Sequence, residues 1–169
     1  MKGMFARIQA LAFLSLLLFA AQPGEAAAVR YPETGVPAVT FDIPDDWIAK
    51  PDDYHNLLIA SADHSTVVTL SMIEYEGSID DLAKAVLQVA KADPPTDKTA
   101  VSVAGLAAFA YLSHAVQEDG KTRVSLRPIF VRVDGVHALI CTVMSESDGD
   151  NPGYLAGKRL VDQFKLVLK

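Results

Sequence analysis

Three short turn motifs divide the second half of the chain into predominantly apolar stretches. The motifs are "AGL" at Ala104 to Leu106, "EDGK" at Glu118 to Lys121 and "VDGV" at Val133 to Val136. Asp-Gly is typical of tight hairpins, because both central residues of a type I′ turn need a positive φ. We therefore expect a four-stranded antiparallel meander, whose strands are Thr99 to Ala104, Leu106 to Gln117, Thr122 to Val133 and Val136 to Ser145.

The stretch 106–117 carries apolar side chains on both faces of the strand that it predicts. One face holds Leu106, Ala108, Ala110, Leu112 and Val116, and the other holds Ala107, Phe109, Tyr111 and Ala115. A sheet that is buried on both sides needs a covering layer on each. Pro128 interrupts the next strand, where it cannot donate to a ladder, so a bulge or break is expected at "LRPIF".

Two amphipathic segments can supply the covering layers. "GSIDDLAKAVLQVAKAD" places Ile79, Leu82, Ala83, Val86 and Ala90 on one face of a helix. Ser78 with Asp81 resembles a capping box, and Pro94-Pro95 follows the end. The second helix is expected to begin with Asn151 as N-cap and Pro152 as its first residue, and to run to the C-terminus. Its inward residues are Tyr154, Leu160, Val161, Phe164 and Leu168.

Three more strands precede the first helix, at Ala38 to Ile43, Leu57 to Ala62 and Thr66 to Tyr75. The predicted fold class is α+β, with an antiparallel sheet of about seven strands covered by helices on both faces, as an α/β/α sandwich. The predicted element order is β-β-β-α-β-β-β-β-α.

The N-terminus has the layout of a secretory signal peptide. Lys2 and Arg7 precede an apolar run from Ala10 to Ala21, and the small residues of "PGEAAAV" follow. Residues 1–28 are predicted to be removed, by cleavage after Ala26 or Ala28, which leaves a single domain at 29–169. The run is too short for a membrane span, so the mature protein is expected to be soluble, monomeric, and periplasmic or secreted.

The charge and the cysteine content exclude some partners and cross-links. Without the signal peptide the chain holds 13 basic and 20 acidic residues, a net charge of −7. Nucleic acid and anionic lipid are disfavoured as partners, because a surface of this sign repels them. Cys141 lies in the apolar "VHALICTVM", where it is expected to be a small buried strand residue without a disulfide partner.

The chain contains a strand that ends in "FDIPDDW", strands leading through "TVVTLSMIEYEGSIDDLAKAV" into a helix, a "VAGLAA" turn, long hairpins and a terminal helix. Together these elements resemble the PsbP-like superfamily. The likeness covers nearly the whole mature chain, through turn and cap residues. It implies an antiparallel sheet between helical layers and a role in binding or assembly. It implies no catalytic residues.

The stretch "FDIPDDW" contains the chain's single tryptophan and admits two interpretations. Pro44 at the second position of a type I turn, with Asp45 or Asp46 bonded to nearby amides, would steer Trp47 back against the sheet as a core residue. Alternatively, Trp47 is a ligand-stacking platform, with Asp45 and Asp46 as acceptors.

A basic stripe is the second candidate binding site. Lys121, Arg123, Ser125 and Arg127 share one face of a strand by the period-two rule, and Arg123 and Arg127 could hold an anionic ligand. The structural alternative is pairing with Gln117, Glu118 or other acids across the sheet.

No pattern in the sequence specifies a metal, a cofactor or a reaction. Glu146, Asp148 and Asp150 alternate, but they lack the spacing of an EF-hand loop. The four histidines, His55, His64, His114 and His137, form no zinc motif. Ser113 and His114 are adjacent on a strand and therefore point to opposite faces. The predicted function is a non-catalytic binding or assembly protein that contacts an envelope protein or complex; the alternatives are a small-molecule carrier and an enzyme whose residues converge only in three dimensions.

Overall fold

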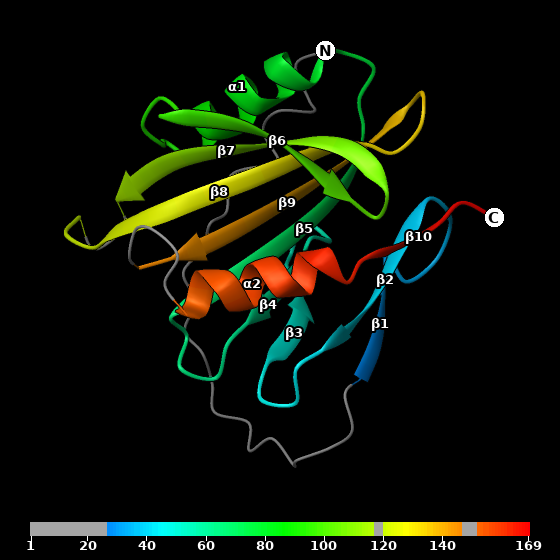
Figure 1. Cartoon of the computed structure of the whole chain (residues 1–169), viewed down its shortest axis with the longest axis horizontal. Coiled ribbons are helices and arrows are strands. Elements are labelled where there is room, and N and C mark those ends of the chain that lie inside the picture. The colour runs from blue at the N-terminus through cyan, green and yellow to red at the C-terminus, as the bar shows by residue number, and fades with distance from the viewer. Residues whose placement is uncertain (1–26, 117–119, 147–151) are drawn as a thin grey trace.

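The computed structural model describes residues 27–116, 120–146 and 152–169 (Figure 1). Their strands are β1 (Ala27–Tyr31), β2 (Ala38–Ile43), β3 (Ile48–Pro51), β4 (Leu57–Ala60), β5 (Thr66–Glu74), β6 (Asp97–Val103), β7 (Leu106–Val116), β8 (Arg123–Arg132), β9 (His137–Ser145) and β10 (Lys165–Val167). The helices are α1 (Ile79–Val89) and α2 (Pro152–Asp162). The signal-peptide prediction falls mostly on residues 1–26, which lie outside the described residues.

Seven of the strands form one antiparallel sheet, in the order β3-β4-β5-β9-β8-β7-β6. An antiparallel sheet of seven strands is therefore confirmed, with six of the seven predicted strands in it, and so is the meander β6 to β9, in which each strand pairs with the next in the chain. In Figure 1 these strands lie side by side and fan across the molecule between the two helices.

The predicted element order is wrong, because three short strands were not anticipated. β1 and β10 flank β2 in a second, three-stranded sheet, so β2 leaves the main sheet and β3 takes the edge position there. These three strands have three to five residues each, and their sequences show no clear alternation of apolar and polar residues.

The second helix ends at Asp162 instead of running to the C-terminus. The N–H groups of Gln163 and Phe164 bond to carbonyls three residues back, which tightens and closes the last turn. The chain then pairs with β2, with Leu166 opposite Val39. Phe164 and Leu168 are four residues apart, a helical spacing, and for this reason the sequence predicted a helix through them. In the structure Phe164 is buried and Leu168 is exposed. The predicted N-cap, Asn151, lies outside the described residues.

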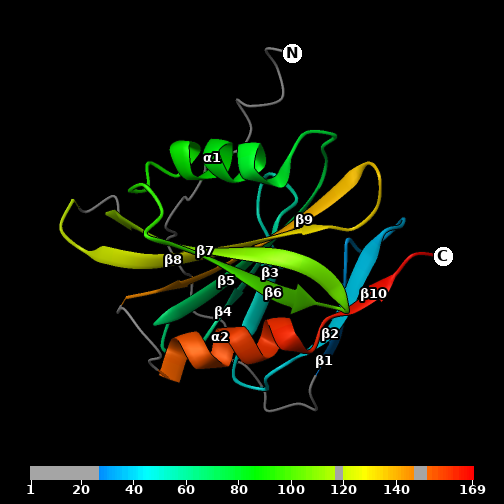
Figure 2. The same cartoon turned by 45° about the horizontal axis from the view of Figure 1, so that its top comes forward.

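The two faces of the large sheet have different covers. α1 packs Leu82 and Ala83 against Phe130, Ala138 and Ile140 on one face. On the opposite face, Leu160 and Val161 of α2 join a cluster that also contains residues of the three-stranded sheet. Figure 2 shows α1 above the large sheet and α2 below it. The second cover is thus a helix together with a sheet, rather than the helical layer of the expected sandwich.

The start of α1 follows the predicted capping box. Ser78 has an extended backbone, its hydroxyl accepts a hydrogen bond from the Asp81 N–H at 3.1 Å, and the same hydroxyl donates to the Asp81 carboxylate at 2.7 Å. Arg132 of β8 donates to the backbone carbonyls of Tyr75 and Gly77, in the connection that leads into α1. These contacts fix the entry of α1 onto the sheet.

Pro128 is buried inside a continuous β8 and does not produce a bulge. Its ladder with β9 is complete, because Pro128 pairs with Thr142. The ladder with β7 is interrupted at this point, yet Ala110 pairs with Ile129 and Ser113 with Leu126 in one register. The expected break therefore affects one of the two ladders, the one in which the missing N–H would have donated.

The hairpin turns differ in type. The turn predicted at "AGL" is present, and Ala104 and Gly105 have φ values of 51° and 81°, the positive values of the type I′ geometry that was expected at the Asp-Gly turns. The turn at Asp134-Gly135 reverses the chain, but neither residue has a positive φ, so a type I′ turn there is wrong. Instead, the Asp134 carboxylate accepts hydrogen bonds from the N–H groups of Val136 at 2.8 Å and His137 at 2.6 Å. An Asx-type turn replaces the expected backbone geometry.

This turn predicts an acid-sensitive contribution to stability. Hydrogen bonds from the His137 and Val136 amides lower the pKa of Asp134 from 3.8 to about 2. Because the pKa is lower in the folded state, the contribution is complete above about pH 4 and is lost as the pH falls towards 2. We expect Asp134→Asn to flatten the dependence of the melting temperature on pH in that window. A variant that keeps the wild-type slope would contradict this role.

Cys141 lies at the centre of β9 and is completely buried. Burial raises the pKa of its thiol well above the ordinary value. The prediction of a small buried strand residue is confirmed.

Candidate functional site

A groove with a volume of about 490 Å³ lies between α1 and the β6–β7 hairpin. One wall is the side of α1 that carries Asp80, Ala83, Lys84, Leu87 and Gln88. Lys98 of β6 and Tyr111 of β7 form the opposite wall, and residues 92–95 close one end.

The wall on α1 follows from helical geometry. Positions 80, 83, 84, 87 and 88 repeat at three and four residues, so they share one stripe of the helix. Ala83 and Leu87 are buried at the base of this stripe, whereas the side chain of Lys84 is 80% exposed at its rim. The groove therefore has an apolar base and a charged rim.

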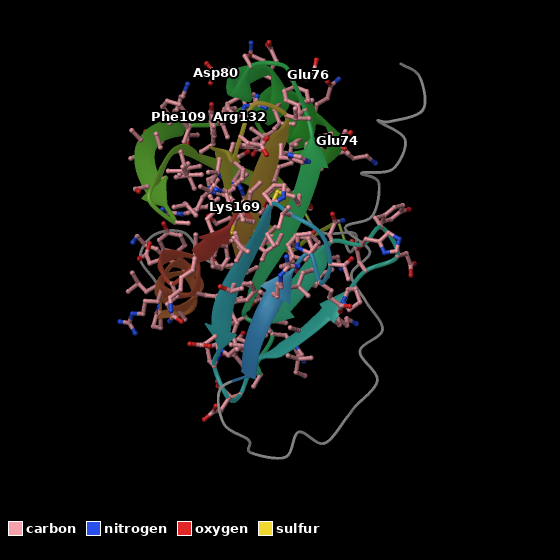
Figure 3. All side chains as sticks on the ribbon, turned by 90° about the vertical axis from the view of Figure 1, so that its right-hand side faces the viewer. Glu74, Glu76, Asp80, Phe109, Arg132 and Lys169 are labelled. Atoms are coloured by element: carbon pink, nitrogen blue, oxygen red, sulfur yellow. The ribbon has the colours of Figure 1, made fainter. Side chains whose placement is uncertain are left out.

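Three polar side chains meet at one end of the groove. The Asp80 Oδ1 atom accepts hydrogen bonds from Lys98 Nζ and from the Tyr111 hydroxyl, each at 2.6 Å. The ammonium group of Lys98 also lies 4.3 Å from the centre of the Phe109 ring, in cation–π geometry. In Figure 3, Asp80 lies at the end of the molecule occupied by α1, and Phe109 and Arg132 lie below it.

These contacts fix the protonation states of the three groups. The hydrogen bond from Lys98, followed by that from Tyr111, lowers the pKa of Asp80. The same bond to Asp80 raises the pKa of Lys98, and burial, followed by the bond to Asp80, raises the pKa of Tyr111. At neutral pH the cluster is a carboxylate, an ammonium and a protonated phenol. It can orient a ligand by hydrogen bonds and charge.

Removing the phenol tests this cluster. We expect Tyr111→Phe to move the pKa of Asp80 upward, towards its ordinary value, because the carboxylate loses a hydrogen-bond donor. A carbon-13 NMR titration of the aspartate carboxyls measures the shift. Tyr75→Phe is the matched control, since the donors to the Asp80 carboxylate are Lys98 and Tyr111 and not Tyr75. An unchanged Asp80 titration in Tyr111→Phe would show that the bond does not form in solution.

The other end of the groove is held by Asp93. Its N–H donates to the His114 carbonyl at 2.7 Å, and its own carbonyl accepts from the buried Ser113 hydroxyl. Its carboxylate pairs with Arg123 at 3.1 Å, with both side chains more than half exposed. Ser113 and His114 point to opposite faces, as predicted, and Ser113 anchors the connection between α1 and β6.

The residues predicted as a stacking site lie on the turn between β2 and β3, away from the groove lining. The Trp47 N–H donates to the Pro44 carbonyl at 2.9 Å, so Pro44 holds the first position of the turn and the predicted second position is wrong. Asp45 and Asp46 are exposed, and Trp47 is half-buried against the core cluster that contains α2. The burial of Trp47 is thus intermediate between that of a core residue and that of an exposed stacking platform.

Arg123 and Arg127 of the basic stripe have different partners. Arg123 pairs with Asp93, in line with the structural alternative of ion pairing with an acid. Arg127 lies on the face covered by α2, with its guanidinium 4.0 Å from the centre of the Tyr154 ring. Arg123 and Arg127, like Trp47, Asp45 and Asp46, remain predictions as binding residues, and none of the five lines the groove.

Among the described residues, no group of three or more histidine, cysteine or acidic side chains is placed to hold a metal ion. Of the acidic stretch at 146–150, Asp148 and Asp150 lie outside the residues that the structure describes. In that same part of the chain, neither helix is long and apolar enough to cross a membrane.

A second, smaller hollow of about 240 Å³ lies where the 31–37 loop meets the ends of β5 and β9. Glu74 and His137 line it, and Figure 3 labels Glu74 on β5. His137 Nδ1 lies 2.8 Å from the Asp134 carboxylate. This pair has the form of a catalytic acid–histidine contact, but here it closes the β8–β9 turn, and its carboxylate already accepts two backbone hydrogen bonds.

Sequence reasoning identified the helix that forms the groove but not the groove itself. The capping box and the Pro94-Pro95 pair were recognised as helix boundaries. The contact between Asp80 and Lys98 spans 18 residues and depends on the position of α1 over the sheet. Neither residue carries a local signal that would link it to the other.

Comparisons with known proteins show the fold but no family. No protein-family model matches the chain, and no curated protein matches its sequence. The crystal structure of LpqN, described as involved in cell envelope biogenesis of Mycobacterium tuberculosis, is similar with a TM-score of 0.52 at 19% identity. That match covers 84% of this chain and 90% of LpqN.

A second similar fold is a crystal structure from Bacteroides thetaiotaomicron VPI-5482, with a TM-score of 0.54 at 13% identity. The match covers 78% of this chain and 46% of the other, so this chain spans less than half the length of that protein. Neither similarity supports the PsbP-like superfamily specifically, and that resemblance stays a prediction.

Proposed function

We propose that the chain is exported and that its mature part, residues 29–169 or two residues longer, is a soluble, non-catalytic binding or assembly protein of the cell envelope. The groove between α1 and the β6–β7 hairpin is the binding surface, and the partner is an envelope protein or complex. The mature protein acts as a monomer until it meets that partner.

The main support for this proposal is that the groove combines an apolar base with charged side chains whose protonation states are fixed. Ala83, Leu87 and the proline pair offer apolar contact, and Asp80, Lys98 and Tyr111 hold one another in a single geometry. Such a surface loses little entropy when a partner binds, because its polar groups are already ordered. Its charged members are held in the protonation states that suit hydrogen bonding to a partner.

Two further features support an envelope role. The N-terminal layout of residues 1–28 predicts export. The similar fold of LpqN belongs to a protein described as involved in cell envelope biogenesis. Fold similarity at this level gives no partner.

The two alternative classes have less support. A small-molecule carrier needs a cavity enclosed between sheet and helix, whereas the groove opens to solvent beside the exposed Lys84. The pair of His137 and Asp134 does not favour an enzyme, because its carboxylate is occupied in closing a turn.

Site-specific cross-linking in living cells tests the proposal. A photoreactive amino acid at Gln88, inside the groove, is expected to form a covalent adduct with an envelope protein. The same amino acid at Lys50 on β3, at the opposite edge of the large sheet, is the matched control. Equal adduct yields from both positions, or none from Gln88, would contradict a binding role for the groove.

Export is tested separately by sequencing the N-terminus of the mature protein. The expected first residue is Ala27 or Val29. Cleavage after Ala26 keeps β1 whole, while cleavage after Ala28 removes two residues that pair with Ile43 and Asp42. An unprocessed Met1 in an envelope fraction would contradict the predicted signal peptide.

A further inference from the structure

β6 is an outer strand of the seven-stranded sheet and has one open side. It pairs with β7 at seven successive positions, from Asp97 opposite Leu112 to Val103 opposite Leu106. Its other side has no strand partner among the described residues. Five of its seven residues are exposed, including Thr99 and Ala100 at its centre.

The turn geometry shows which backbone groups face the open side. In a two-residue type I′ hairpin, the residues that flank the turn exchange both hydrogen bonds. Val103 therefore bonds to Leu106, and by alternation Val101 and Thr99 also direct their N–H and C=O groups to β7. Lys98, Ala100 and Ser102 direct theirs outward.

This edge lacks the usual protection against strand pairing. Natural edge strands are commonly blocked by proline, bulges or outward lysines. The segment Thr99–Val103 holds no proline and no charge, and its register with β7 is regular. The one lysine of β6, Lys98, extends along the surface to Asp80 and the Phe109 ring.

The groove lies beside this edge on the side that α1 covers. Lys98 lines the groove, and alternation places the side chains of Ala100 and Ser102 on the same face. A strand added to β6 would direct every second side chain to that face, towards the apolar base formed by Leu87 and Ala83. Backbone pairing and a side-chain pocket would then act together, as in other strand-addition interfaces.

Charge selects the kind of strand that fits. The Asp97 carboxylate accepts a hydrogen bond from Thr99 at 2.9 Å, and it makes no ion pair with any described residue. The mature chain carries a net charge of −7. A cation in the added strand can face Asp97, and a cationic segment is attracted to the whole molecule.

We propose that β6 binds an extended, cationic segment of a partner protein as an eighth strand of the sheet. This inference rests on the proposed binding function and specifies its chemistry. The partner segment alternates cationic or polar residues with apolar ones, and its apolar side chains enter the groove beside α1.

Amide hydrogen exchange of the mature protein, followed by NMR, tests the proposal. The probes are a nine-residue peptide of alternating valine and lysine, a copy with alternate backbone amides methylated, and a valine–glutamate copy. In the free protein, the amides of Lys98, Ala100 and Ser102 should exchange faster than those of Thr99 and Val101. The valine–lysine peptide should slow the three outward amides by at least about tenfold at saturation.

Two variants assign that protection to the edge. Ala100→Pro removes an outward N–H without removing a bond to β7, so it should weaken binding of the valine–lysine peptide at least about tenfold. Asp97→Asn should reduce the preference for the valine–lysine over the valine–glutamate peptide. The methylated peptide, which leaves the protein unchanged, covers the case in which Ala100→Pro does not fold.

The outcomes separate this inference from the proposed function. If the valine–lysine peptide protects none of the outward amides, or if the methylated peptide protects them equally, strand addition at β6 is wrong. An adduct from Gln88 would then still support the groove. If neither peptide protection nor a Gln88 adduct is found, the proposed function fails as well.

Discussion

Phe130→Ala should destabilise the protein by about 3–5 kcal/mol, a large part of the 5–15 kcal/mol typical of a domain. Phe130 is completely buried and packs between the sheet and α1. Its ring meets Tyr111 edge-on at 5.6 Å between centroids. The substitution leaves a cavity beneath the helix that forms one wall of the groove. Chemical denaturation followed by circular dichroism measures the change.

Phe109→Ala is the matched control for Phe130. The Phe109 side chain lies on the same face of the sheet but is 38% exposed, so its removal should cost about 1 kcal/mol. If the two variants lose equal stability, the packing of α1 against Phe130 described here is wrong. Loss of the Gln88 cross-link in Phe130→Ala, at a temperature where the variant is folded, would further connect this packing to the groove.

Gly157→Ala should destabilise the protein by about 1–3 kcal/mol, although alanine is a better helix former than glycine by about 1 kcal/mol. Gly157 is buried on the side of α2 that faces β9. A methyl group at this position would lie 2.7 Å from Val143 Cγ1 and 3.3 Å from Thr66 Cγ2. Both neighbours are β-branched and buried, so neither can turn aside easily.

A double-mutant cycle with Val143→Ala isolates this contact. The double variant should be more stable than the sum of the single effects predicts, by at least about 0.5 kcal/mol, because the smaller side chain makes room for the new methyl group. Additive effects, or a Gly157→Ala variant that is more stable than the wild type, would show that α2 lies farther from β9 than the structure has it.

The sequence predicted the long strands well because their boundaries are marked by residues with strict backbone requirements. The hairpin turn at Ala104-Gly105 lies where it was expected, and the Ser78 cap has the expected geometry. Pro128 shows the limit of such a rule: its missing N–H interrupts one ladder, while burial and the intact ladder with β9 keep the strand continuous.

The remaining features depend on contacts between distant segments. Lys165–Val167 is a strand because β2 offers an open side, and the local pattern there favours a longer helix. The candidate site is of the same kind, since Asp80 and Lys98 meet only when α1 rests on the sheet. The five candidate binding residues were chosen from the sequence for their aromatic or charged side chains. The groove, in contrast, is formed by residues that are common in any helix or strand.

Lysine footprinting in the intact envelope tests the central claim most directly. Lys84 stands at the rim of the groove with an 80% exposed side chain, and Lys158 on α2, on the opposite face of the large sheet, has a 50% exposed side chain. An amine-reactive label applied to the purified mature protein should modify both. In the envelope, we expect Lys84 to be labelled at least about fivefold less while Lys158 is unchanged. Equal labelling of Lys84 in the two preparations would contradict the groove as the site where this protein meets its partner.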